Sequence, residues 1–162
     1  MVPMPRRWLG GLSAALILAS GVALAQQPSM NRWTGTWKRN LARSAYSPGP
    51  APQTEQIVRL DIVNGLLQVT ENEADAQGRP TPHVYLVNFD GTEQTVDADR
   101  GLTRIYRWID ERKFEAINRV KREETTMMEY ALADDGKAYT VTTTGITAQG
   151  QLVHHTVVYE KQ

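Results

Sequence analysis

Apolar and polar residues alternate with a short period over most of this chain. Beyond Gln53, runs rich in β-branched, aromatic and aliphatic residues are separated by short polar segments, which is typical of half-buried strands. Asn64-Gly65, Asp90-Gly91 and Asp135-Gly136 lie between such runs, and these dipeptides tolerate the positive φ of tight hairpin turns. The pattern predicts strands at 33–39, 54–62, 66–73, 82–89, 92–96, 103–109, 114–120, 125–132, 138–144 and 152–161.

The connections between these strands are too short for helical crossovers, so consecutive strands should be antiparallel. An open sheet of this size would expose two edges, and closure removes them. We therefore expect an all-β fold, an antiparallel up-and-down meander of about 8–10 strands closed into a small barrel. Its outward positions include Arg59, Glu115 and Arg119. Because a lipid-facing barrel surface is apolar, we do not expect the mature chain to span a membrane.

Residues 40–53 interrupt the alternation. Pro48, Pro50 and Pro52 stand close together, and proline is excluded from helix interiors and central strands. We expect a proline-rich loop over 40–53, between the first and second strands. Such a loop either covers one mouth of the barrel or forms a mobile linker.

The N-terminal residues have the features of an export signal. Arg6 and Arg7 precede an uncharged apolar run from Trp8 to Leu24, and Ala23-Leu24-Ala25 supplies a small-x-small cleavage pattern. We expect a signal peptide at 1–25, a single barrel domain at 26–162, and a periplasmic or secreted protein. The alternative is an uncleaved anchor, because the apolar run is near the length of a membrane span.

Composition excludes several classes of function. The chain has 18 basic and 18 acidic residues, so loss of Arg6 and Arg7 leaves a weakly acidic protein, unlike a nucleic-acid binder. The absence of cysteine excludes disulfides and thiolate chemistry. His154 and His155 are adjacent and leave opposite faces of a strand, so we expect no metal site. No catalytic or cofactor-binding motif is found, and we expect neither an enzyme nor a cofactor; the oligomeric state stays open.

Two segments resemble the calycins, the group of lipocalins and fatty-acid-binding proteins. Gly35-Thr36-Trp37-Lys38 resembles their Gly-x-Trp first strand. The segment Val157 to Lys161 resembles the last strand of the fatty-acid-binding branch. The longer stretch from Gly35 to Pro50 (GTWK-x-N…S-x-Y-x-PGP) is similar to a group of exported bacterial proteins with no assigned activity. The resemblance implies a calycin-like barrel.

The chain also departs from fatty-acid-binding proteins. In that family two helices lie between the first strands, where this chain has its proline-rich segment. An arginine two residues before the tyrosine of the last strand holds a carboxylate in the family, and Val157 stands there in this chain. For Gly35 and Trp37 we expect a structural role: the indole plugs one end of the barrel, and the glycine lets the backbone pass close by.

Arg107 is the first candidate for ligand binding. It lies between Ile105 and Ile109 on one face of its strand. If that face is inward, the guanidinium enters the barrel and requires a carboxylate or another anionic partner. The opposite register places Tyr106 and Trp108 inside, which buries more aromatic area, and leaves Arg107 in water.

Tyr130, His155 and Tyr159 are the other candidates, because strand parity places each beside apolar inward neighbours. Convergent polar groups in an apolar cavity are typical of a small-molecule site, although such groups also satisfy one another or a buried water. The leading hypothesis is an exported binding module for an apolar or amphipathic small molecule. The alternatives are a side-chain-filled barrel that acts as a periplasmic interaction or structural protein and, less expected, a barrel enzyme.

Overall fold

The computed structural model describes residues 30–74, 79–147 and 149–162. The expected signal peptide at 1–25 lies outside them. A 3-10 turn, η1 (Met30–Arg32), precedes the strands β1 (Gly35–Ser47), β2 (Ile57–Val63), β3 (Leu66–Ala74), β4 (Pro80–Val87), β5 (Glu93–Asp97), β6 (Leu102–Asp110), β7 (Lys113–Val120), β8 (Glu123–Leu132), β9 (Ala138–Ile146) and β10 (Leu152–Lys161). Every predicted strand is therefore observed. Within the described ranges, no helix has the length and apolar character needed to cross a membrane.

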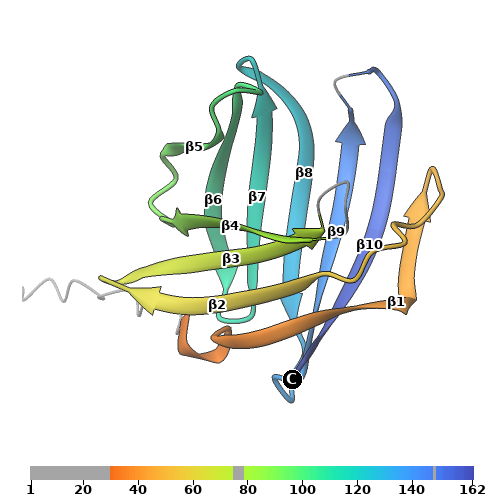
Figure 1. The fold of residues 1–162 in the computed structure, drawn as a ribbon. Coiled ribbons are helices and arrows are strands. Elements are labelled where there is room, and N and C mark those ends of the chain that lie inside the picture. Colours follow the sequence, from red (N-terminus) through yellow and green to blue (C-terminus); the bar gives the residue numbers. More distant parts are fainter. Residues whose placement is uncertain (1–29, 75–78, 148) are drawn as a thin grey trace, which may run out of the picture.

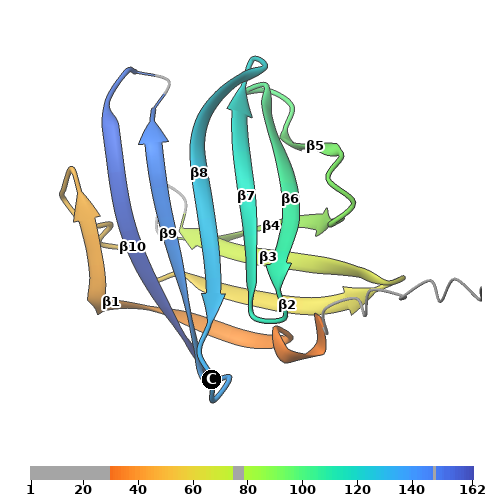
Figure 2. The same cartoon turned by 180° about the vertical axis from the view of Figure 1, so that it is seen from behind.

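The strands form one antiparallel meander that is nearly closed. Their order in the sheet is β4-β3-β2-β1-β10-β9-β8-β7-β6-β5. Consecutive strands pair with each other except β4 and β5, which form the two edges of the sheet, and β1 also pairs with β10. β2, β3 and β4 cross in front of the strands β6 to β10 (Figure 1), and the view from behind shows the same crossing from the far side (Figure 2). The barrel interior lies between these two layers.

The edge strands β4 and β5 are bridged by side chains. The segment that follows β4 is joined to β5 through Gln94, whose Oε1 accepts from the backbone N of Asn88 at 2.9 Å and whose Nε2 donates to the Asn88 carbonyl at 2.6 Å. The Gln94 amide thus bonds to both backbone groups of Asn88, as the backbone of a neighbouring strand would in an antiparallel sheet. The Phe89 ring stacks on Trp108 of β6 with ring centroids 4.3 Å apart. The seam of the barrel is therefore covered by an amide and an aromatic ring.

Strand β1 is longer than the sequence predicts. Residues 40–47, expected to belong to the proline-rich loop, continue the strand to Ser47, and only the residues from Pro48 to Gln56 connect it to β2. The prediction of a loop from residue 40 was wrong because the pairing with β10 resumes after an irregularity between Asn40 and Ala45. Three prolines end the strand, as their chemistry requires.

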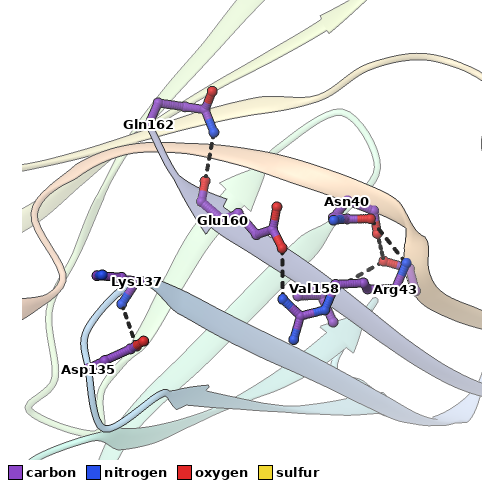
Figure 3. A network of polar contacts seen from close by, with 8 residues as sticks. Asn40, Arg43, Asp135, Lys137, Val158, Glu160 and Gln162 are labelled. Atoms are coloured by element: carbon purple, nitrogen blue, oxygen red, sulfur yellow. Dashed lines mark hydrogen bonds and ion pairs between the residues drawn. The ribbon is translucent and has the colours of Figure 1, made fainter.

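Side chains hold this irregularity in place (Figure 3). The Asn40 side-chain oxygen accepts from the backbone N of Arg43 at 3.1 Å, and Ser44 donates to the Asn40 carbonyl at 2.6 Å. The Ser44 hydroxyl also accepts from the backbone N of Val158 on β10 at 3.0 Å, in place of a backbone carbonyl of β1. Arg43 and Glu160 form an ion pair at 2.7 Å. β1 can therefore bend from one layer of the barrel into the other without losing β10.

Candidate functional site

The inner faces of the strands enclose a cavity of about 200 Å³. Alternation along the strands turns every second residue inward. Most of the lining is therefore apolar; it includes Val58, Leu60, Leu67, Val69, Val87 and Val141. A hollow of this kind, lined by apolar groups with a few polar ones, is the usual form of a small-molecule site.

Four aromatic side chains pack together in the core, and we call them the aromatic cluster: Trp33, Trp37, Phe114 and Tyr139. All but Trp37 belong to the cavity lining. Trp33 and Trp37 have no exposed surface. The Trp37 indole Nε1 donates to the Trp33 carbonyl at 2.9 Å, and Tyr139 packs edge-on against Trp37 with centroids 4.9 Å apart. Phe114 stacks on Tyr130 at 4.3 Å. Such contacts stabilise the fold beyond their buried area.

A second group, the polar cluster, brings ionisable side chains into the same interior. It consists of Glu71 from β3, Tyr85 from β4, Arg104 and Tyr106 from β6, and Asn118 from β7. The Tyr85 hydroxyl donates to Glu71 Oε1 at 2.8 Å, and Arg104 Nη1 donates to the Tyr106 hydroxyl at 3.0 Å. Arg104 Nε donates to Asn118 Oδ1 at 2.5 Å. All but Asn118 lie in the cavity lining.

A third set of polar groups lies where β10 meets the segment before β2. The Tyr159 hydroxyl donates to Gln56 Oε1 at 2.7 Å, and Arg39 Nη1 donates to the same oxygen at 3.2 Å. Gln56 is buried, so these two bonds satisfy an amide oxygen that would otherwise be costly to bury. The Tyr159 ring stacks on Tyr139 with centroids 4.7 Å apart.

The tyrosines of the interior stay protonated. Burial raises the pKa of Tyr85, Tyr106, Tyr130 and Tyr139, because a phenolate is poorly solvated there. Their hydroxyls therefore remain neutral hydrogen-bonding groups at physiological pH, able to donate as well as accept. They provide polarity to the cavity without adding charge.

The structure places Arg107 outside the barrel. Its side chain is 55% exposed, and its Nη1 lies 4.0 Å from Glu115 Oε1 on the adjacent strand. Tyr106 is buried and Trp108 packs against the core. The hypothesis of an inward Arg107 was therefore wrong: the register that buries the aromatic side chains is the one adopted, because it removes more apolar surface from water.

The other three candidates are divided between the cavity and its surroundings. Tyr130 and Tyr159 lie in the lining, as parity suggested. His155 is not part of it. Its Nδ1 accepts from the backbone N of Ser47 at 3.2 Å, and its ring packs 5.3 Å from that of Tyr46. His155 therefore fastens the far half of β1 to β10, and the expectation that it points into the cavity was wrong because β1 extends over it.

Gly35 and Trp37 are arranged as the sequence indicates. Trp37 is fully buried, and the Lys161 ammonium lies 5.0 Å from the centre of its ring. Gly35 has φ +132°, and a Cβ there would approach Lys161 Cε to 2.8 Å. The positive φ is the reason for glycine here, because the close contact is only with the flexible end of the Lys161 side chain, which can move aside. How much the plug contributes to stability stays a prediction.

Sequence reasoning missed the charged residues that do enter the cavity. Arg104 follows from the adopted register, because it lies two residues before Tyr106 on the same face. Glu71 follows Leu67 and Val69 on the inner face of β3, but its neighbours Glu73 and Asp75 indicated a solvated strand end. In both cases alternation along the strand places the residue on the inner face. That signal is easily missed, because a charged residue is not expected to face inward.

The comparisons with known proteins concern the fold. No protein-family model and no curated protein matches the chain. Among solved structures, the wild-type fluorescent protein UnaG is similar, with a TM-score of 0.57, 16% identity, and coverage of 83% of this chain and 100% of UnaG. Zebrafish ileal bile acid-binding protein complexed with cholic acid has a TM-score of 0.50 and 12% identity, with coverage of 81% and 99%. Together with the strand order, these likenesses show that the chain has the same fold as these two proteins, a nearly closed barrel of antiparallel strands.

Proposed function

We propose that this protein is an exported binding protein that holds an apolar or amphipathic small molecule inside its barrel. The observation that carries the proposal is the cavity of about 200 Å³, whose lining combines many apolar side chains with several polar ones. A barrel of this strand number can also be filled by its own side chains. The open interior favours the binding function over that alternative.

The polar groups suggest how the ligand is oriented. Tyr130 and Tyr159 present hydroxyls in the lining, and Arg104 of β6 and Glu71 of β3 provide charge there. An amphipathic molecule would place its apolar part against the valines and leucines and its polar end toward these two charged side chains. Support for this class of ligand also comes from the shared fold, since one similar structure is a bile acid-binding protein that holds cholic acid.

Export is the other part of the proposal. It rests on Arg6, Arg7, the apolar run and Ala23-Leu24-Ala25. Expression of the full chain in a Gram-negative host should give a periplasmic protein whose N-terminus is Gln26. Full-length chain in the membrane fraction would contradict this part of the proposal while leaving the binding function untouched.

Native mass spectrometry of protein from that periplasm tests the binding function. We expect an extra mass under native conditions that disappears on denaturation. The variant Val141→Phe fills part of the cavity and should lose the extra mass. Val84→Phe is the matched control, because Val84 is 54% exposed on edge strand β4, and should retain it. An extra mass that survives Val141→Phe, or its absence from the wild type, would contradict a ligand in the barrel.

A further inference from the structure

Two opposite charges share the cavity without forming an ion pair. Arg104 and Glu71 both lie in the lining, yet their only hydrogen bonds within the described residues are to neutral groups: Tyr106 and Asn118 for Arg104, and Tyr85 for Glu71. Buried charges are usually paired with each other or with a ligand. The Arg104 guanidinium and the Glu71 carboxylate can therefore each form a further hydrogen bond or ion pair with a ligand.

The position of Arg104 is fixed by its neighbours. Asn118 donates through Nδ2 to Thr126 Oγ1 at 2.8 Å and to Met128 Sδ at 3.3 Å, so its Oδ1 is turned toward Arg104 Nε. The Tyr106 hydroxyl accepts a hydrogen bond from Arg104 Nη1, and the guanidinium lies 5.8 Å from the centre of the Tyr106 ring. Nη2 makes no hydrogen bond to any described residue. A preorganised guanidinium with free N–H groups is ready to donate to an oxygen atom of a ligand.

Glu71 is held in the same way on the opposing strand. Tyr85 donates to Oε1, and the other carboxylate oxygen makes no hydrogen bond to the part of the chain that is described. The two charges act on a shared space: Glu71 raises, and Arg104 lowers, the pKa of Tyr85, Tyr106 and Tyr130, in addition to the larger effect of burial. The Tyr85 hydroxyl also interacts with Tyr106, so the hydroxyls of two tyrosines separate the carboxylate from the guanidinium.

We propose that the polar end of the ligand is an uncharged group with an adjacent acceptor and donor, such as an amide or lactam, that accepts from Arg104 and donates to Glu71. This inference rests on the proposed binding function and narrows its ligand class. Val157 is an apolar part of the lining two residues before Tyr159, so β10 adds no second positive charge to receive an anion.

Charge balance is the reason for an uncharged head. A carboxylate ligand would gain attraction to Arg104 but would add repulsion from Glu71 in the same low-dielectric space, and it would lose its hydration. An amide loses less hydration and satisfies both free groups at once. Glu71 therefore acts as a specificity residue that rejects anions, while Arg104 anchors the acceptor atom.

Titration calorimetry at neutral pH with a matched pair of probes, decanamide and decanoate, tests the inference on the mature protein after removal of co-purified lipid. For the wild type we expect decanamide to bind at least about tenfold more tightly than decanoate. The two probes share the same apolar chain, and only decanoate places a negative charge near the Glu71 carboxylate. Glu71→Gln keeps the size and the acceptor for Tyr85 but removes the charge. It should tighten decanoate binding by about tenfold and change decanamide binding much less.

Two variants on opposite faces of β6 complete the test. Arg104→Met should weaken both probes, whereas Arg107→Met, on the same strand and facing solvent, should leave both affinities unchanged. Tighter binding of decanoate than of decanamide to the wild type would overturn the inference and leave the binding function standing. Equal affinities in Glu71→Gln and wild type would also overturn it. Failure of both probes to bind any form would contradict the proposed function itself.

Discussion

The aromatic cluster and the polar cluster occupy the same barrel and solve different problems. In the aromatic cluster, Trp33 and Trp37 are completely enclosed, and one indole N–H is satisfied by a backbone carbonyl. In the polar cluster, Arg104 and Glu71 keep donors and acceptors without a partner among the described residues and face a cavity. The first arrangement lowers the free energy of the fold. The second arrangement leaves polar groups available for a ligand and thereby lowers the stability of the fold, as functional sites commonly do.

The largest effect should come from opening the aromatic cluster. Trp37→Ala removes a fully buried indole and should lower the free energy of unfolding by about 3–5 kcal/mol. Urea denaturation followed by circular dichroism measures this. At low temperature, the folded variant should still prefer decanamide over decanoate, because the polar cluster is intact. An unchanged urea midpoint would refute the plug role of Trp37.

Alkaline pH should act on the buried tyrosines next. Their pKa is raised in the folded protein, so the unfolded chain releases these protons first as the pH rises. Stability is therefore fully present below pH about 10, the ordinary tyrosine pKa, and falls above it by about 1.4 kcal/mol per buried tyrosine per pH unit. Thermal unfolding at increasing pH tests this sign. Tyr130→Phe should reduce the slope, and stability that rises above this pH would contradict the burial of these phenols.

A smaller effect is expected from Tyr85→Phe, which removes the only hydrogen bond that a described residue makes to the Glu71 carboxylate. The variant should lose about 1 kcal/mol of stability. Its decanoate affinity should change as well, since the carboxylate is freed to move toward Arg104. Urea denaturation and calorimetry together separate the two clusters: a variant within the aromatic cluster but outside the cavity lining, Trp37→Phe, should leave the preference between the two probes unchanged.

The smallest effect should come from Arg107→Met. Its partner Glu115 is 4.0 Å away and the arginine is largely exposed, and exposed ion pairs contribute little. Its free energy of unfolding should stay within about 0.5 kcal/mol of the wild type. A loss as large as that caused by Arg104→Met, seen in parallel urea titrations, would show that the two faces of β6 are assigned incorrectly.

The contrast between Arg104 and Arg107 also shows what the sequence could predict. Alternation with a period of two and hairpin dipeptides were sufficient for the ten strands, because both signals are local. The face of β6 was not decided by alternation, since Ile105 and Ile109 on one side compete with Tyr106 and Trp108 on the other. The packing of Trp108 against Phe89 and Phe114, which are distant in sequence or on another strand, selects the register. That choice carries Arg104 inward.

The far half of β1 is a second case. Prolines at 48, 50 and 52 correctly mark the end of the strand, but the residues before them have no clear alternation. Their strand conformation depends on β10, through the Ser44 hydroxyl and the pairing of Tyr46 with His155. Such long-range pairing has no local signature. The same pairing removes His155 from the set of cavity residues, so errors in the fold and in the site have one cause.

The central claim, that the cavity takes up an amphipathic molecule, is tested most directly by methyl NMR during a titration with decanamide. The account predicts saturable shifts for methyl groups of the lining, such as those of Val58, Leu67 and Val141. Val84 and Leu86, which are 54% and 48% exposed, should remain unshifted. Shifts confined to Val84 and Leu86, or no saturable shift in the lining, would contradict a binding site inside the barrel.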